Sequence, residues 1–350
     1  MPRLRRSDPS LPGLTRRRRG RGFVYVDHLG KRVTDQETLA RIRGLVIPPA
    51  WRDVWICPLP SGHLQAVGTD AAGRKQYLYH PRWRARRDQQ KFDRMLEFAA
   101  ALPGVRAATR AHLAEEGLTR NRVLACATRL LDRGFFRIGS EEYAGSNGTY
   151  GLATMRRSHV RLGPEGRIEF HYLAKGRKEH VQSVVDPEVH EVVAQLLRRR
   201  GDHELLAYKA GGRWRDLRSE DINAYVKEIA GTEYSAKDFR TWHGTVMAAM
   251  ALAVAAPAAR SRTATKRAMS WAVKDVAQYL GNTPAVCRAS YIDPRLFDRF
   301  RSGWTIAGVL DELGTDRLGE PELQGIIEEA VIDLIRGDDS PAVRRVERAA

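Results

Sequence analysis

At 350 residues the chain is long enough for two domains with cores of their own, and its 43% hydrophobic and 29% charged residues are typical of a globular protein rather than a disordered one. Its net charge of +17 and its pI near 10.2 favour a polyanionic partner, of which nucleic acid is the first candidate. Residues 301–350 hold 11 acidic residues against six arginines, so the positive charge is concentrated before them.

Cysteine usage and hydropathy exclude several further classes. Cys57, Cys126 and Cys287 are far apart and form no C-x-x-C pair, which argues against a disulfide framework or a zinc site and fits a reducing cytoplasm. The most apolar stretch, residues 246–259, is shorter than the roughly 18 residues of a membrane span. The basic N-terminus lacks the apolar core of a signal peptide, so we expect a cytoplasmic protein without a membrane segment.

Residues 1–22 contain eight arginines, three prolines and one aspartate. This composition predicts a basic flexible arm. Such an arm can be a solvated tail, or it can lie along phosphates and add to the salt dependence of binding.

Residues 23–90 predict a small, mainly antiparallel β domain with strands over 23–26, 54–57, 63–68 and 76–80 and a helix over 36–45. In the last strand, a period of two places Gln76 on one face and Tyr77 and Tyr79 on the other. Arg74 leads into this strand, and the arginine-rich segment 81–87 follows it. A basic, aromatic edge of this kind can hold phosphates and touch base edges, although a strand with two exposed tyrosines would look the same.

Residues 91–350 predict a larger, mostly helical domain that contains a three-stranded antiparallel sheet over 158–162, 167–173 and 178–184, so the fold class is α+β. We expect helices over 89–102, 105–116, 120–133, 189–200, 219–229, 242–256 and 271–280. Residues 257–270 are expected to be a basic linker, and residues 310–350 an acidic helical tail.

Three basic residues in this domain stand where an anion could be held. Arg137 lies between apolar neighbours, where a guanidinium should have an anionic partner. Lys175 is at the tip of the hairpin between the second and third strands, a place where lysines are usually inert. Arg240 is expected at the mouth of the helix over 242–256, capped by Asp238 or Thr241, where an anionic oxygen would be stabilised.

The stretch from Gln278 to Pro294 predicts a helix end, a tight turn and a short second helix. Gly281 is placed for a left-handed C-terminal cap, and Thr283 and Pro284 supply an N-cap and a first helical residue. The second helix runs towards Tyr291 and stops near Pro294. Tyr291 by itself is most simply a half-buried helix tyrosine.

Taken together, five stretches resemble the type IB DNA topoisomerases, specifically the small poxvirus and bacterial kind. They are residues 73–79, 136–139, 174–177, 237–241 and 280–284 together with Tyr291. Each motif is weak alone, but their order and intervals match the family across most of the chain.

The resemblance implies that Tyr291 attacks a DNA phosphodiester and forms a 3′-phosphotyrosyl link. It further implies that Arg137 and Arg240 clamp the phosphate, that Lys175 is the general acid, and that Asn282 belongs to the same site. The covalent link conserves the bond energy, so neither ATP nor a divalent cation is required.

By the same resemblance, duplex DNA is contacted from both domains, which close around it as a monomeric clamp on nucleoid DNA. The contacting residues would be Arg74, Gln76, Tyr77 and Tyr79 of the first domain and Tyr143 and Lys237 of the second.

Two positions bear on this interpretation. Many relatives have a histidine where this chain has Asn282, and an amide can donate to a phosphate oxygen but cannot carry charge. The related tyrosine recombinases have a histidine three residues before the second arginine, where this chain has Lys237, as the topoisomerases do.

Two alternatives stay open at this stage. A tyrosine recombinase is disfavoured by Lys237 and by the sheet motif over 73–79, which is foreign to the typically helical recombinase domains. A nonenzymatic architectural DNA-binding protein would explain the charge but not the constellation of site residues.

Overall fold

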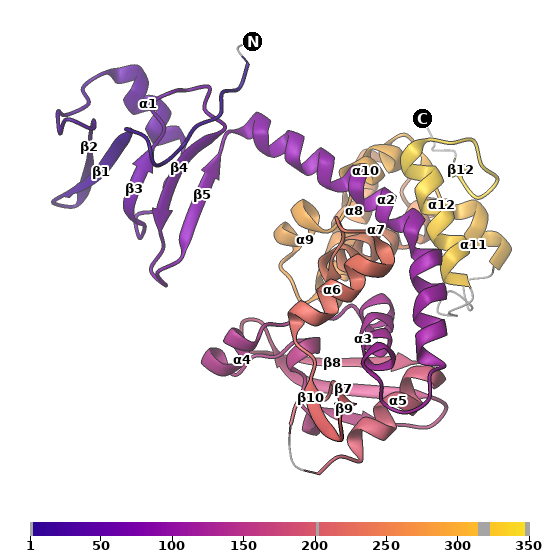
Figure 1. The fold of residues 1–350 in the computed structure, drawn as a ribbon. Helices are drawn as coiled ribbons and strands as arrows, with labels where there is room; N and C mark the ends of the chain where they lie inside the picture. The colour runs from indigo at the N-terminus through magenta and orange to yellow at the C-terminus, as the bar shows by residue number, and fades with distance from the viewer. Residues whose placement is uncertain (1–2, 201–202, 314–322, 347–350) are drawn as a thin grey trace. The chain divides into compact units, whose positions relative to one another are not determined.

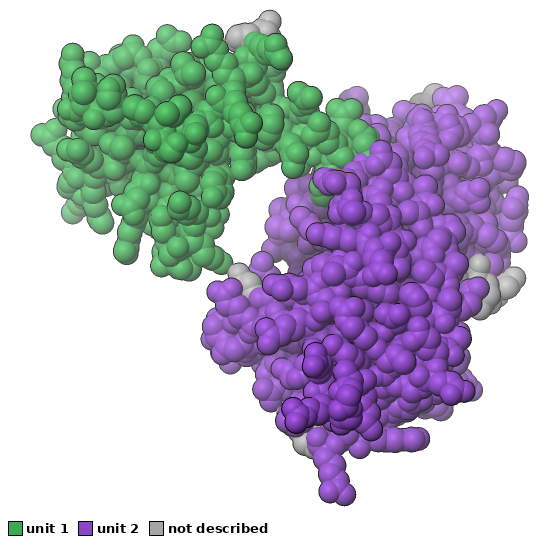
Figure 2. All heavy atoms as spheres, in the orientation of Figure 1, with its two compact units in different colours: residues 1–93 green, residues 94–350 purple. Residues whose placement is uncertain are grey.

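The structure, a computed structural model, describes residues 3–200, 203–313 and 323–346. The chain divides into two units, Met1–Asp93 and Arg94–Ala350, which are coloured separately in Figure 2. Each unit has its own elements and its own core, and each is described by itself.

The first unit is a five-stranded antiparallel sheet with one helix against it (Figure 1). Its elements are β1 (Leu14–Arg19), β2 (Gly22–Val26), α1 (Gln36–Gly44), β3 (Arg52–Ile56), β4 (Leu64–Thr69) and β5 (Lys75–Tyr79). The strand order is β2-β1-β3-β4-β5. Ile42 of α1 packs on Val54, Ile56 and Ala66 of the sheet, and Leu78 joins this core from β5. The tyrosines that alternate with Leu78 therefore lie on the opposite, open face, as the period of two predicts.

The second unit is mostly helical and contains a three-stranded antiparallel sheet in the order β6-β7-β8. Helix α2 (Pro81–Leu113) begins in the first unit and continues into the second. The remaining elements are α3 (Arg120–Gly134), α4 (Glu141–Asn147), β6 (Val160–Leu162), β7 (Arg167–Ala174), β8 (Lys178–Val185), α5 (Pro187–Leu197), β9 (Ala207–Ala210), β10 (Arg213–Asp216), α6 (Ser219–Ala230), α7 (Ala236–Ala255), α8 (Arg262–Leu280), α9 (Pro284–Ser290), α10 (Pro294–Arg301), β11 (Trp304–Thr305), α11 (Ala307–Leu313), α12 (Gln324–Arg336) and β12 (Arg344–Arg345), with 3₁₀ turns at Leu152–Thr154, Arg157–His159 and Ala256–Ala258.

Helices α3 and α7 form the centre of this unit, because most of their side chains are buried on all sides. They pack on each other, and β8 packs on α3. The α+β class, the first antiparallel sheet and the three-stranded sheet are as the sequence predicts.

The N-terminal segment differs from the flexible arm expected over residues 1–22. Residues 14–19 form β1, which pairs with both β2 and β3. The cause is that alternate residues of this arginine-rich segment, Leu14 and Arg16, face the sheet's inner side. Leu14 packs on the core, and the Arg16 guanidinium donates to the carbonyl oxygens of Ile47, Pro48 and Trp51. An arginine that hydrogen-bonds backbone carbonyls can occupy the inner face of a sheet edge.

Helix α2 also differs from the expectation, because one helix replaces the two predicted over 89–102 and 105–116. Pro103 lies inside it, where an interior proline costs about 3 kcal/mol. Leu102 and Val105, on either side of the proline, are buried in the second unit, and this burial offsets the local cost.

Two helices begin earlier than expected. Helix α7 starts at Ala236, with Ser235 as its N-cap and Asp238 at the third position of a capping box, so neither Asp238 nor Thr241 is the cap. Arg240 is therefore inside the helix and not at its mouth. Helix α8 starts at Arg262 behind the N-cap Ser261, so most of the expected basic linker over 257–270 is helical.

The acidic C-terminal segment is built into the second unit where it is described. Helix α12 packs against α7, α10 and α11. Its Glu328 is buried and receives hydrogen bonds from Arg106 of α2 at 2.7 and 2.9 Å. Residues 314–322 and 347–350 of the expected tail lie outside the described residues.

Candidate active site

Tyr291 is held at the end of a short helix by local sequence signals. Gly281 ends α8 in the left-handed conformation with φ of 60°. Thr283 then caps α9 by accepting a hydrogen bond from the backbone N–H of Val286, and Pro284 occupies the first helical position. Tyr291 is the C-cap of α9, and α10 begins three residues later at Pro294. This is the local structure that the sequence predicts.

The backbone around Tyr291 is fastened to α7. The hydroxyl of Thr245 donates to the carbonyl oxygen of Tyr291 at 3.3 Å and accepts from the N–H of Asp293 at 3.1 Å. Gly244 permits the approach, since a Cβ atom there would lie 2.7 Å from the same carbonyl oxygen. The helix that carries Arg240 therefore also fixes the chain at Tyr291.

Arg240 is 5% exposed and lies beside the Tyr291 ring, with its Cζ atom 5.5 Å from the ring centroid. Its Nη1 group donates to the carbonyl oxygen of Phe135, and its Nη2 group donates to that of Leu280 at 2.7 Å. Burial, together with the neighbouring charge of Arg137, lowers the pKa of Arg240 to about 10, so it remains a cation at neutral pH.

Arg137 reaches the same helix end. Its Nη2 group donates to the carbonyl oxygens of Leu280 at 3.3 Å and Gly281 at 3.0 Å, and to Oδ1 of Asn282 at 2.5 Å. Two guanidinium groups thus share the carbonyl of Leu280. The last carbonyl groups of a helix carry partial negative charge, and α8 therefore stabilises two cations that would otherwise repel each other.

Asn282 is oriented by this contact. Because its Oδ1 accepts from Arg137, its Nδ2 group is a donor, and Nδ2 is buried without a hydrogen-bond partner among the described residues. A buried amide donor next to two guanidinium groups suits an anionic oxygen.

His180 is a site residue that the sequence reasoning missed. It lies on β8, paired with Tyr172 of β7, and a Cβ atom on Gly281 would be 2.3 Å from its Nε2 atom. Burial lowers the pKa of His180, and Arg137, Arg240 and Lys178 lower it further. The sequence shows only a histidine three positions after the expected hairpin turn, and its pairing with Tyr172 becomes evident only from the strand register.

Two of the predicted site residues, Lys175 and Lys237, have no hydrogen bond or ion pair to this cluster within the described part of the chain. Lys175 is exposed at the tip of the β7–β8 hairpin, where Gly176 and Arg177 adopt positive φ values of 82° and 57°. Lys237 is exposed in the first turn of α7. Tyr143 belongs to α4, and its side chain lies outside what the structure describes.

In the first unit, Tyr77 and Tyr79 are 46% and 39% exposed and stack with ring centroids 6.3 Å apart. Arg74 and Gln76 both donate to the Asp70 carboxylate, at 3.0 and 2.9 Å. The backbone N–H of Arg74 and these side chains lower the pKa of Asp70 to about 2. The tyrosines are therefore free to stack on a ligand, whereas Arg74 and Gln76 are already engaged with an acidic residue.

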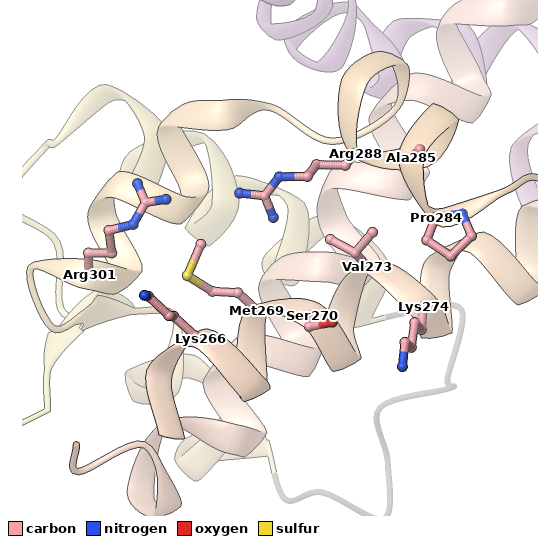
Figure 3. Close-up of a pocket in the computed structure, with 9 residues that line it drawn as sticks. All are labelled: Lys266, Met269, Ser270, Val273, Lys274, Pro284, Ala285, Arg288 and Arg301. Atoms are coloured by element: carbon pink, nitrogen blue, oxygen red, sulfur yellow. The ribbon is translucent and has the colours of Figure 1, made fainter. Parts of the chain in front are cut away.

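A separate basic pocket of about 440 Å³ lies between α8, α9 and α10 (Figure 3). Its cationic lining residues are Lys266, Lys274, Arg288 and Arg301. The Arg288 guanidinium extends towards Arg301 and packs on the Phe297 ring at 4.4 Å, while Arg301 pairs with Asp298 at 2.5 Å. Tyr291, Arg137 and Arg240 do not line this pocket, so it is distinct from the cluster around Tyr291.

The described residues contain neither a metal-binding group nor a membrane-spanning helix. No group of three or more His, Cys, Asp and Glu side chains in them is arranged to hold a metal ion. None of the helices found in residues 3–200, 203–313 and 323–346 combines the length and hydrophobicity needed to cross a bilayer.

Comparison with known proteins shows which family this chain resembles. Residues 80–299 match the family model described as eukaryotic DNA topoisomerase I, catalytic core, and residues 22–70 match that of the bacterial DNA topoisomerase IB N-terminal domain. The chain is 28% identical to the DNA topoisomerase 1B of Acanthamoeba polyphaga mimivirus over 288 residues, which are 81% of this chain and 85% of the viral protein. It is also 26% and 24% identical to the DNA topoisomerases 1 beta and 1 alpha of Arabidopsis thaliana, over 45% of this chain and 16% of each plant protein.

The catalytic-core match covers more than half of the chain, and it contains Arg137, Arg240, Asn282 and Tyr291. The N-terminal match covers α1 and three strands of the first unit's sheet, β2, β3 and β4, and the recombinase alternative does not explain this match. The chain therefore belongs to the type IB DNA topoisomerase family.

Proposed function

We propose that this topoisomerase relaxes supercoiled duplex DNA by cutting one strand through Tyr291, allowing the free end to rotate, and resealing the break. The observation that carries the proposal is the pair of guanidinium groups, Arg137 and Arg240, held on the carbonyl oxygen of Leu280 beside the Tyr291 ring.

The chemistry is a phosphodiester exchange. The phenolic oxygen of Tyr291 attacks the phosphorus atom, the bond from phosphorus to the 5′ oxygen breaks, and a 3′-phosphotyrosyl link forms. The phenol loses a proton, and the leaving 5′ oxygen gains one. Lys175 is the proposed proton donor, since it is a cation exposed at the turn of the β7–β8 hairpin and the family resemblance gives it this role.

Arg137 and Arg240 would meet the charge that develops on the nonbridging phosphate oxygens. The Nδ2 group of Asn282 would add a neutral donor to one of them. Because one phosphodiester replaces another, resealing is the reverse reaction and needs no ATP. Because fixed cations neutralise the phosphate, we propose that no divalent cation is required.

Duplex DNA is the proposed substrate of both units. In the first unit, the exposed pair Tyr77 and Tyr79 would contact DNA, supported by Arg74 and Gln76. In the second, Lys237 and Tyr143 would do so. We propose a monomer that closes around the duplex as a clamp, acting in the cytoplasm on nucleoid DNA.

The deciding experiment compares the wild type with Tyr291→Phe. The variant removes only the nucleophilic oxygen, so plasmid relaxation should be lost while duplex binding is retained. Relaxation by the wild type is measured with EDTA and without ATP, and detergent trapping should give a covalent adduct linked to the 3′ phosphate at Tyr291. Relaxation by Tyr291→Phe near the wild-type rate would refute the assignment, and recombination between paired sites without relaxation would favour the recombinase alternative.

A further inference from the structure

The segment before β1 is docked on the sheet through residues 5–7. The N–H of Arg5 donates to the carbonyl oxygen of Ser61 at 2.8 Å, and its carbonyl oxygen accepts from the N–H of His63 at 2.8 Å. Ser7 then donates from its N–H to Nδ1 of His63 at 3.0 Å and exchanges hydrogen bonds with the backbone of Leu64 at 2.9 and 3.1 Å. Five hydrogen bonds over three residues give the segment a fixed position.

The side chains of this docked segment are unneutralised cations. Arg3, Arg5 and Arg6 are exposed, and none of them forms an ion pair within the described part of the chain. The Asp8 carboxylate accepts hydrogen bonds from the backbone and side chain of Ser10, and Arg6 acts on it only through its charge. Because the backbone that carries Arg5 and Arg6 is already ordered, only their side chains lose conformational entropy on binding an anion, whereas a flexible tail would lose backbone entropy as well.

Aromatic rings connect this segment to the tyrosines on β5. Tyr79 stacks with Tyr77, its ring centroid lies 6.4 Å from that of His63, and His63 lies 4.8 Å from Trp83 in an edge-on contact. A pocket of about 450 Å³ opens at the end of this row, lined by Leu4, Arg5, Arg6, His63 and Trp83. The row therefore starts at the proposed DNA-contacting tyrosines and ends among the docked arginines.

His63 adds a donor to the pocket. Its Nδ1 atom accepts from the N–H of Ser7, so the ring hydrogen is on Nε2. The pocket thus combines two guanidinium groups, one imidazole N–H and an indole face, with no acidic residue in its lining. These are the groups that hold the sugar–phosphate backbone of DNA without reading its sequence.

We propose that the docked segment, together with His63 and Trp83, is a second DNA-binding surface, which grips the backbone of duplex DNA beyond the part held by Tyr77 and Tyr79. The segment lies outside both matched family ranges, 22–70 and 80–299. The inference rests on the proposed function, because it takes duplex DNA as the substrate.

The test measures the salt dependence of duplex binding by the full chain carrying Tyr291→Phe, with and without Arg5→Ala and Arg6→Ala. Each phosphate contact contributes about 0.9 to the slope of log K against log salt, so the double substitution should reduce the slope by about 2. Between 50 and 200 mM salt, the affinity of the protein with intact Arg5 and Arg6 should therefore fall about tenfold more than that of the double variant. Arg32→Ala with Arg43→Ala is the matched control, since both are exposed arginines of the same unit outside the pocket, and it should leave the slope unchanged.

Duplex length locates the contact. The loss of slope should appear with a long duplex and be absent with the shortest duplex that the wild type still cleaves. An unchanged slope on the long duplex, or an equal loss on both duplexes, would overturn the proposal. Covalent adduct formation, measured with Tyr291 intact, separates the second surface from the proposed function. If Arg5→Ala/Arg6→Ala forms the adduct but the slope does not change, only the second surface is refuted. If the wild type forms no adduct, the proposed function is refuted.

Discussion

A hydrogen bond of 2.5 Å joins Nη2 of Arg137 to Oδ1 of Asn282, across 145 residues of chain. It fixes the amide so that its acceptor faces a cation and its donor, Nδ2, stays buried without a partner among the described residues. The arrangement makes Asn282 a neutral donor that works beside the two arginines.

The cleavage rates of Asn282 variants should therefore depend on whether the new side chain can donate a hydrogen bond to the phosphate. Asn282→Ala loses a donor to a charged oxygen, which is worth about 1.5–3 kcal/mol, and should slow single-turnover strand cleavage about 10- to 100-fold. Arg240→Ala removes a cation with two anchored donors and should cost at least about 10³-fold. Asn282→Asp keeps the acceptor for Arg137 but places an anion against the phosphate, so it should cleave more slowly than Asn282→Ala. Faster cleavage by the aspartate variant would contradict the donor role.

Gly281→Ala should disturb the site through His180. Alanine at φ of 60° costs about 1–2 kcal/mol, and its Cβ atom would lie 2.3 Å from Nε2 of His180. Gly176→Ala is the matched control, because its φ is 82° but a Cβ atom there meets nothing within 4 Å. Urea unfolding should show a larger loss of stability for Gly281→Ala, and only this variant should also slow cleavage. Equal losses of stability in the two variants would show that the His180 side chain moves away from the added methyl group without an energetic penalty.

Local chemistry made much of this fold predictable. Gly281, Thr283 and Pro284 are helix-end signals whose effect depends on their immediate neighbours, and the structure has the predicted turn there. The alternation around Leu78 likewise placed Tyr77 and Tyr79 on the open face. These local features were predicted correctly because a few adjacent residues determine them.

The errors come from residues whose surroundings are distant in the sequence. Arg16 belongs to a strand because the carbonyl oxygens of residues 47, 48 and 51 receive its guanidinium. Pro103 stays in a helix because burial on both sides offsets its cost. His180 joins the site through a cross-strand pair and the end of another helix, and neither is visible in the residues around it.

His180 should make the free energy of unfolding fall as the pH drops below about 6.5. Burial, Arg137, Arg240 and Lys178 lower its pKa in the folded protein below the ordinary value of 6.5. The unfolded chain therefore binds a proton more readily, so the stabilising contribution is complete above pH 6.5 and is lost as the pH falls through the folded pKa. His180→Gln should lose less stability than the wild type between pH 7 and pH 5 in urea titrations. Parallel curves for the two proteins would exclude this linkage.

Lys175 is exposed on its hairpin, so its role is best tested by chemistry. Lys175→Ala should cleave DNA slowly, because the 5′ oxygen is a poor leaving group without a proton. A 5′-bridging sulfur leaves without protonation and should restore the cleavage rate of this variant. Arg177→Ala, an exposed cation of the same turn, is the control and should need no rescue. Slow cleavage of the sulfur substrate by Lys175→Ala would argue against a general acid.

The C-terminal helix should be required for stability through Glu328. Arg106 donates to Asp132 at 2.8 and 2.9 Å and to Glu328 at 2.7 and 2.9 Å, so α2, α3 and α12 meet at one partly buried guanidinium between two buried carboxylates. Glu328→Ala removes hydrogen bonds between charged groups while Asp132 still pairs with the guanidinium, so it should cost about 1.5–3 kcal/mol. Glu329→Ala, at the exposed neighbouring position, should change stability by less than about 0.5 kcal/mol. Thermal and urea unfolding of the two variants check this, and equal stabilities would mean that α12 is held by its apolar contacts alone.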